Sequence, residues 1–294
     1  YTFREKYFKT LNKLYVENFY KKIFEWCEAH GCKLTGHSVE ESCLYMQMWG
    51  GASVTPSYEY EHIPGIDKLG RFCDSELAVK QISGAAAQLG KKRILTETFG
   101  CSGYDVTPKE LKSIAESQYF GGVNVMCQHL YPYSVAGGGR TDHPPVFGPH
   151  GNWNEGFKAF NDYFARLSYI IVNTNETAKV GVINPVRDIW LDYIRSEDYE
   201  SVKQIETDFE EFLAVLRKSG LEYQLIDERI LERHGKAENG VLHVGECTYD
   251  TVIIPKMRNI SASTYGILKG YTGKLCLIGK PLYTDGKRED ISLC

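Results

Sequence analysis

The sequence lacks several features that would assign its class at once. Basic residues are not in excess, since 34 Lys and Arg stand against 38 Asp and Glu, and no block of like charge occurs. This balance argues against a nucleic-acid partner. No apolar run is long enough to cross a membrane, and the opening residues, YTFREKYF, do not resemble a signal peptide. We therefore expect a globular protein whose partners include neither nucleic acid nor membrane.

Paired cysteine motifs are also missing. The nine cysteines are scattered and odd in number, and no CxxC occurs, which argues against a zinc ribbon or a thioredoxin-like site. Several lie inside apolar stretches, such as VNVMCQHL and GKLCLIG. This placement predicts buried free thiols, and hence a reducing, cytoplasmic compartment.

Three nucleotide and hydrolase signatures are absent from the chain. It has no GxGxxG fingerprint, no Walker loop and no GxSxG elbow. A dinucleotide site, a P-loop and an α/β-hydrolase nucleophile are therefore not indicated.

A repeating order of strand, loop and helix is present instead. We expect strands at 32–37, 91–100 and 121–130, with a further one near 63–69. We expect helices at 7–30, from an N-cap at Asp74 or Ser75 to about Leu89, from 108 onward and at 155–171. Thr107, Pro108 and Glu110 predict a capping box for the helix from 108 onward.

Polar residues end each of the three strongest strands. They are His37, Glu97 and His129, and each follows a continuous apolar run. Parallel strands covered on both faces have such runs, and an α/β barrel builds its active site at the carboxyl ends of its strands. Four strands are half of a closed barrel. We therefore expect that residues 1–174 do not close one, either because other strands precede Tyr1 or because the sheet is open.

A second strand–helix region follows Asn173-Thr174-Asn175. Its expected strands are AKVGVINPV, EYQLID, YDTVIIPK and GKLCLIGKP, with an amphipathic helix at 201–219. The order predicts a doubly wound domain at 175–294. The predicted fold class is thus α/β, the C-terminal part of a (β/α)8-type barrel followed by a flavodoxin-like domain.

Two carboxylates are candidates for catalysis. Glu97 ends a buried strand, where an unpartnered charge is unfavourable; the structural alternative is a glutamate paired with an arginine. Glu41 lies four residues past His37, and alternatively it merely opens a helix with Glu40. Glycoside hydrolysis uses two such carboxyls, and which of them would be the acid is not fixed by the sequence.

Other polar and aromatic residues could bind a sugar, whose C–H faces stack on rings. Each could instead have a structural role: a histidine could make all its hydrogen bonds within the protein, and an aromatic side chain could pack at the edge of the core. The candidates are His37, His129, Tyr60, Tyr104, Tyr131 and Trp49. For metal, Asp142, His143 and His150 share one loop, but this loop has no recognisable ligand motif. No metal site or cofactor is therefore predicted.

Four segments in order carry a family resemblance: LTGHSVEES, YEYEHIPGID, ILTETFGCSGYDV and VNVMCQHLYPYS. With NDYFARLSYI they resemble bacterial (β/α)-barrel glycosidases, such as the α-L-rhamnosidases of glycoside hydrolase family 106. The region after them resembles the flavodoxin-like domain that follows the barrel in trimeric β-galactosidases. The resemblance favours Glu41 over Glu40, implies that calcium could assist, and leaves homo-oligomerisation open.

The expected function is hydrolysis of a terminal sugar, α-L-rhamnoside-like or galactoside-like, from an oligosaccharide or glycoside. Three alternatives remain from the sequence: an inert carbohydrate-binding scaffold, a fragment that is inactive alone, and a hydrolase of another ester or amide bond.

Overall fold

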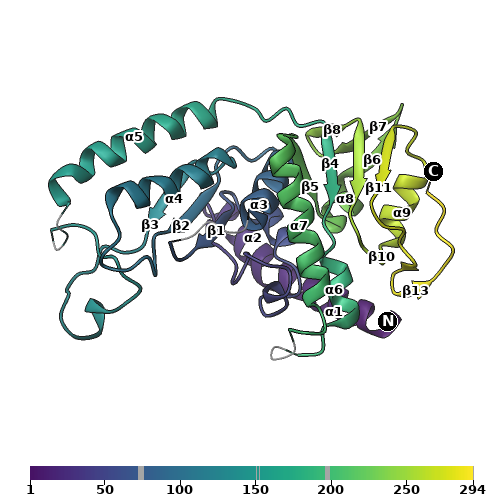
Figure 1. Cartoon of the computed structure of the whole chain (residues 1–294), viewed down its shortest axis with the longest axis horizontal. Coiled ribbons are helices and arrows are strands. Elements are labelled where there is room, and N and C mark those ends of the chain that lie inside the picture. Colours follow the sequence, from purple (N-terminus) through teal and green to yellow (C-terminus); the bar gives the residue numbers. More distant parts are fainter. Residues whose placement is uncertain (72–75, 150, 152, 196–198, 294) are drawn as a thin grey trace.

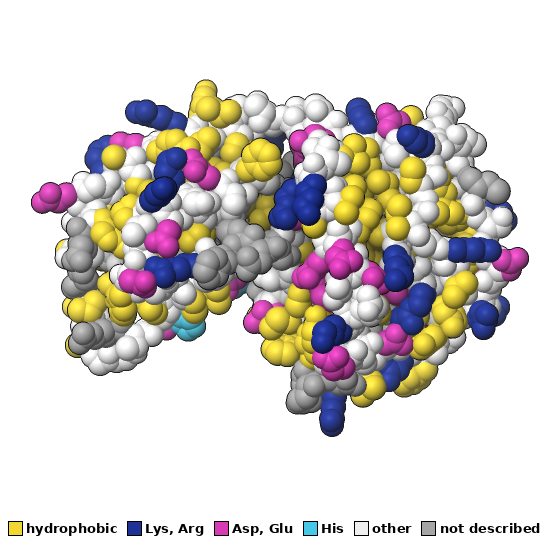
Figure 2. Space-filling model, in the orientation of Figure 1, with side chains coloured by type: hydrophobic (Ala, Val, Ile, Leu, Met, Phe, Trp, Pro, Cys, Tyr) yellow, Lys and Arg dark blue, Asp and Glu magenta, His cyan; other side chains and the backbone are white. Residues whose placement is uncertain are grey.

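The fold contains two parallel sheets. The computed structural model describes residues 1–71, 76–149, 151, 153–195 and 199–293. In Figure 1 the first sheet lies in one lobe below helices α4 (Pro108–Phe120) and α5 (Asn154–Val172), and the second sheet lies in the other lobe. Figure 2 shows acidic and basic side chains interspersed over the face in view rather than gathered by sign.

The first sheet has three parallel strands side by side in chain order. They are β1 (Gly65–Lys68), β2 (Leu95–Thr98) and β3 (Val125–Gln128). The strand expected near 63–69 is therefore confirmed, whereas the one expected at 32–37 is reduced to a single parallel bridge between Thr35 and Ile63. Among the described residues this sheet is open, as half a set of barrel strands predicts.

Most helices of the first region form where the sequence predicts them. Thr107 and Glu110 make the expected capping box at the start of α4. Asp74 and Ser75 lie outside the described residues, and Glu76 is at the N-cap of the helix that follows. The remaining helical segments of this region are α1 (Thr2–Tyr15), η1 (Val16–Tyr20), α2 (Lys21–Ala29), η2 (Met46–Met48), η3 (Thr55–Tyr60), α3 (Leu77–Gln88) and η4 (Gly137–Arg140).

The first long helix departs from its predicted face. Phe19 and Ile23, two apolar residues of the helix expected at 7–30, are 50% and 36% exposed. The cause is η1, a π-helical turn, because its wider i→i+5 turn shifts the phase of the residues within and after it. Val16 and Tyr20 become the buried residues of this turn instead.

The second sheet has four parallel strands in the order β11-β9-β4-β5, so the four strands expected in this region are present; a flavodoxin-like domain stays a prediction. Two small sheets of short strands, β6-β7-β8 and β10-β12-β13, were not predicted, because strands of two to four residues carry little periodicity. The elements are β4 (Val180–Ile183), α6 (Val186–Asp192), α7 (Lys203–Ser219), β5 (Tyr223–Ile226), α8 (Glu228–His234), β6 (Gly235–Glu238), β7 (Val241–Val244), β8 (Cys247–Tyr249), β9 (Thr251–Ile254), β10 (Asn259–Ile260), α9 (Ala262–Lys269), β11 (Lys274–Leu277), β12 (Tyr283–Thr284) and β13 (Lys287–Arg288).

Helix α3 joins the two regions. A Cβ atom at Gly84 would lie 2.6 Å from the carbonyl oxygen of Leu225 on β5, so the helix crosses the strand with no room for a side chain. Four residues on, Gln88 Nε2 donates to that same oxygen at 2.9 Å and to Tyr249 Oη at 2.8 Å. The domain boundary at 174/175 stays a prediction, but the two regions share one core.

The cysteines are less buried than expected. Cys127 is exposed and Cys276 is only partly buried, whereas Cys27 is buried. The prediction was wrong for Cys127 because β3 is an edge strand of its sheet. The seven cysteines within the described ranges are all free. None of the described helices is both long and apolar enough to cross a membrane.

Candidate functional site

The carboxyl ends of the first sheet bring several ionisable side chains together. Glu97 on β2 is in register with Asp67 on β1. Neighbouring strands lie about 4.8 Å apart, so these two carboxylate-bearing residues are side by side on the sheet. His129 follows the last residue of β3, and its backbone N–H donates to Thr98 O at 2.9 Å. His37 comes two residues after the bridge at Thr35.

Glu97 lies between two imidazoles. Its Oε2 is 3.0 Å from His37 Nε2, its Oε1 is 3.9 Å from His129 Nε2, and its side chain is 28% exposed. In the described part of the chain it has no arginine partner, in contrast to the structural alternative. The carboxylate is therefore held by histidines and is still open to solvent.

The position of protons on His37 follows from its other contact. Its Nδ1 is 2.7 Å from the carbonyl oxygen of Ser38, which can only accept, so Nδ1 carries a hydrogen. A second proton is then shared between Nε2 and Glu97. Burial lowers the pKa of His37, but the Ser38 carbonyl and the charges of Asp67, Glu41 and Glu97 outweigh it, and the net shift is upward.

Glu41 belongs to the same electrostatic cluster but is enclosed. It is 1% exposed, and neither carboxylate oxygen has a hydrogen-bond partner among the described residues. Burial raises the pKa of Glu41 to about 7, with His37 opposing this shift and Asp67 adding to it. At neutral pH this side chain therefore holds a proton for much of the time.

The sequence reasoning missed Asp67. Burial raises the pKa of Asp67, the charge of Glu97 adds to the rise, and its Oδ1 has no partner among the described residues. The signal that could have found it is the one used for Glu97, because Asp67 is also a polar residue near the carboxyl end of a strand.

A second buried carboxyl, Glu61, interacts electrostatically with Glu41. It is 0% exposed, its Oε2 accepts from Gly65 N at 3.3 Å, and burial raises the pKa of Glu61 to about 8, with the charge of Lys91 opposing this rise. The charges of Glu61 and Glu41 both act on the fully buried hydroxyl of Tyr58. Both glutamates thus have pKa values that burial raises toward neutrality or above.

The aromatic candidates divide by exposure. Tyr60 is 7% exposed and packs edge-on against Phe24 at 6.1 Å between ring centroids, so little of its ring is free; its role in sugar binding stays a prediction. Trp49, Tyr104 and Tyr131 are 50%, 52% and 66% exposed. These three retain a free ring surface.

The loop after β2 fits closely against His129. Gly100 permits this, because a Cβ atom there would lie 2.8 Å from Leu69 Cδ2 and 3.3 Å from His129 Cγ. On each side of it, Phe99 and Cys101 adopt the left-handed conformation, with φ of 82° and 61°. The loop therefore helps to fix the imidazole beside Glu97.

No metal centre is evident in the described ranges. They contain no group of three or more His, Cys, Asp or Glu side chains arranged for an ion. His143 Nδ1 lies 2.8 Å from Asp142 Oδ1, and His150 lies outside the described residues. A role for calcium stays untested.

Comparison with known proteins gives a consistent but distant picture. No family model matches the chain. A curated protein of Formosa agariphila named "Putative beta-glucuronidase" is 28% identical over 178 residues, which cover 58% of this chain and 14% of that protein. The chain therefore spans about a seventh of this relative.

Solved structures resemble the chain over nearly its whole length. A rhamnosidase from Novosphingobium sp. PP1Y matches with a TM-score of 0.69 at 16% identity, over 95% of this chain and 26% of that one. Gan42B, a GH42 β-galactosidase from G. stearothermophilus, has a TM-score of 0.63 at 11% identity, over 99% of this chain and 43% of that one. A β-galactosidase from Bacillus circulans sp. alkalophilus has a TM-score of 0.59 at 13% identity, over 96% of this chain and 41% of that one. The chain therefore has a glycoside hydrolase-like fold.

Proposed function

We propose that the chain carries the active-site part of a glycoside hydrolase that removes a terminal sugar, α-L-rhamnoside-like or galactoside-like. In this proposal the first sheet belongs to a (β/α)8-type barrel and the second to a flavodoxin-like domain. One observation carries it: Glu97, held by two histidines and open to solvent, lies beside a second carboxyl at the strand ends.

Glycoside hydrolysis needs one ionised and one protonated carboxyl on either side of the scissile bond. Glu97 fits the ionised group, since a charged His37 contacts it. Two groups fit the proton donor because burial raises their pKa values: Asp67, next to Glu97 on the sheet, and Glu41, whose pKa is about 7. Environments that separate the pKa values of neighbouring carboxyls are typical of acid and base pairs.

The remaining predicted residues would bind the sugar. His37 and His129 can donate to or accept from ring hydroxyls, and the exposed rings of Trp49, Tyr104 and Tyr131 offer stacking surfaces. The free cysteines, three of them exposed, suit the reducing cytoplasm proposed as its location.

A panel of chromogenic α-L-rhamnosides, β-galactosides and β-glucuronides tests the proposal. We expect hydrolysis of at least one, and a fall in kcat of roughly 10²–10⁴-fold in Glu97→Gln. Glu211→Gln, an exposed carboxylate on α7, is the matched control and keeps full activity. Asp67→Asn and Glu41→Gln then identify the proton donor, because only the donor's loss spares substrates with good leaving groups.

An inert carbohydrate-binding scaffold is the second candidate. The open first sheet and the enclosed Glu41 favour it. Binding of a glycoside without turnover of any panel member would establish this reading and overturn the hydrolase.

A further inference from the structure

The segment that carries Glu41 lacks regular secondary structure, since residues 36–45, which the structure describes throughout, form neither helix nor strand. Glu40, next to Glu41, adopts the left-handed conformation with a φ of 62°. A residue other than glycine stays in this region only where its surroundings hold it there. The place of Glu41 therefore depends on contacts with other elements. It shares with Glu97 a group of ionisable side chains, the Glu97 cluster, made up of His37, Glu41, Asp67, Glu97 and His129.

Glu206, in the first turn of α7, supplies two of these contacts. Its Oε1 accepts from Leu44 N at 2.9 Å and its Oε2 accepts from Tyr45 N at 2.8 Å, so one carboxylate binds two consecutive backbone N–H groups. The residue is 2% exposed, and hydrogen bonds to an ionised acceptor are stronger than neutral ones. Burial raises the pKa of Glu206 to about 7, and the two N–H groups oppose this rise.

The apolar side chains of the segment pack on the same helix. Leu44, Tyr45 and Met48 are buried in one core cluster with Phe209 and Leu213 of α7. The backbone bonds to Glu206 and the apolar packing thus attach this part of the chain to the second region, although Glu41 itself belongs to the site of the first.

A further polar contact reaches the backbone of Glu41 directly. Gln81 on α3 is 0% exposed, and its Nε2 donates to the Glu41 carbonyl oxygen in a long hydrogen bond of 3.4 Å. Its Oε1 accepts from Gln47 Nε2 at 3.1 Å and from Asn184 Nδ2 at 2.9 Å. Asn184 follows β4, so a side chain of the second region orients the amide that contacts Glu41.

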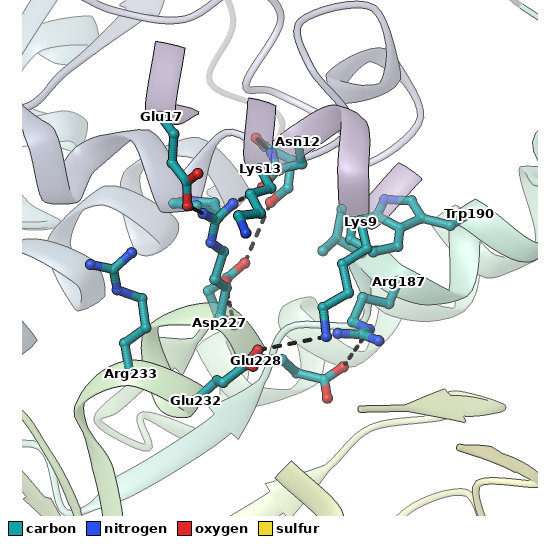
Figure 3. Close-up of a pocket in the computed structure, with 14 residues that line it drawn as sticks. Lys9, Asn12, Lys13, Glu17, Arg187, Trp190, Asp227, Glu228, Glu232 and Arg233 are labelled. Atoms are coloured by element: carbon teal, nitrogen blue, oxygen red, sulfur yellow. Dashed lines mark hydrogen bonds and ion pairs between the residues drawn. The ribbon is translucent and has the colours of Figure 1, made fainter. Parts of the chain in front are cut away.

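The far end of the segment is fixed at the wall of a cavity. Asn12 Nδ2 of α1 donates to Gly51 O at 2.9 Å, and Trp190 Nε1 of α6 donates to Ala52 O at 2.7 Å. Figure 3 shows Asn12 and Trp190 among the side chains that line this cavity. The segment is therefore bound on both sides of η2, by α7 before it and by α1 and α6 after it.

We propose that Glu206 is a positioning residue, which acts through the backbone of Leu44 and Tyr45 to hold Glu41 enclosed within the Glu97 cluster. This inference rests on the proposed function, in which Glu41 is one of two candidates for the proton donor. It gives the second region a part in the site of the first, because a helix of the second region fixes a carboxyl of that site.

Titration of the Glu41 carboxyl by ¹³C NMR tests the proposal, with Glu41→Gln identifying the resonance. In the unaltered chain we expect a midpoint at about pH 7. Glu206→Gln places an amide NH₂ group where one oxygen accepted from a backbone N–H, so the segment loosens. Water then reaches Glu41, and its midpoint falls by about one pH unit or more. Glu210→Gln removes an exposed charge from the same helix and leaves the midpoint within about 0.3 units.

Glu206→Asp separates contact from charge. It keeps the carboxylate but is one methylene shorter, so it cannot reach both N–H groups, and we expect the Glu41 midpoint to fall here as well. A purely structural role for Glu206 would lower stability without moving this midpoint. An unchanged midpoint in Glu206→Asp, with the fold confirmed by circular dichroism, would therefore overturn the proposal. Hydrogen exchange of the unaltered chain needs no variant: exchange of the Leu44 and Tyr45 amides at the rate of an exposed loop would refute the two bonds.

Activity gives a separate measurement. On the glycoside that the parent hydrolyses best, Glu206→Asp should lower kcat about tenfold or more for poor leaving groups and spare activated ones. Absence of turnover in the parent, or an unchanged kcat in Glu41→Gln, would overturn the role proposed for Glu41 as proton donor. In either case the carboxyl titration still decides whether Glu206 holds Glu41 in place, so the two failures are distinguishable.

Discussion

The carboxyl ends of both parallel sheets carry ionisable clusters, and the two clusters neutralise their charges differently. Around Glu97, the carboxyls of Glu97, Glu41 and Asp67 lie near two histidines and, among the described residues, no arginine. Protonation of these groups, rather than a permanent cation, therefore neutralises much of their charge. Around Arg187, a buried guanidinium contacts Glu5, Glu228 and Asp285. The first arrangement has no permanently charged cation, whereas the second is centred on a guanidinium whose charge is permanent, although burial raises the pKa of Glu5 beside it to about 7.

The largest expected effect concerns the permanent charge. Arg187→Met leaves Glu228 and its neighbours buried without a cation, so we expect a loss of about 3–5 kcal/mol in the free energy of unfolding. Arg217→Met is the control, because its side chain is 55% exposed and lies 3.9 Å from Glu76; it changes stability by less than about 1 kcal/mol. Urea unfolding measures both, and equal losses would contradict the contrast.

The next effect concerns the proton-balanced cluster. Glu41 has a pKa of about 7 in the folded chain against 4.5 for the free group, so the folded state binds more protons between these values. Stability therefore falls as pH rises from about 5 to 8. In Glu41→Gln the free energy of unfolding should fall less between these pH values, by about 1–3 kcal/mol, because the variant lacks this titrating group. Unfolding free energies of the parent and the variant at both pH values measure the difference. A slope unchanged from the parent would show that Glu41 does not hold this proton, and Glu211→Gln serves as the matched control.

His37 connects this balance to activity. Its raised pKa keeps it charged to higher pH than an ordinary imidazole, and loss of that charge removes the partner of Glu97. We expect the alkaline limb of kcat/KM to disappear in His37→Gln, together with a loss of about tenfold or more. His243→Gln on β7 keeps the parental profile. An alkaline limb that survives in His37→Gln would place that titration on another group.

The smallest effect concerns Tyr131, an exposed aromatic residue two positions past His129. Tyr131 is 66% exposed, and its ring lies so close to Gly148 that a Cβ atom there would be 2.2 Å away. Tyr131→Ala is expected to raise KM roughly two- to tenfold with stability unchanged. Tyr169→Ala, equally exposed but on α5, leaves KM unaltered. A change in kcat alone would show that the ring acts in another way.

Sequence reasoning reached the elements with strong periodicity and clear caps. The capping box of Thr107 and the polar ends of β2 and β3 follow from local residue order, which is why Glu97, His37 and His129 could be placed together. Asp67 was missed because the polar strand ends were taken only from the three strongest strands, and the strand expected near 63–69 was not among them. Burial of Tyr60 and of Glu41 depends on tertiary packing, which local pattern does not encode.

The face of the first helix could not be predicted for a different reason. A regular period was assumed from Tyr7 to His30, and the π turn at Val16–Tyr20 breaks it. Similarly, Cys127 sits in an apolar run, but its exposure depends on whether another strand lies beside β3.

The contact of α3 with β5 has a consequence for how the molecule melts. With Gly84 pressed against Leu225 and Gln88 bonded to the same carbonyl, neither sheet can lose its order without exposing this helix. Differential scanning calorimetry would then record one heat-absorption peak for the chain, with equal calorimetric and van't Hoff enthalpies. Cooperativity of this kind would make the carboxylates around Arg187 and the Glu97 cluster lose their order together on heating, although the two groups share no residue.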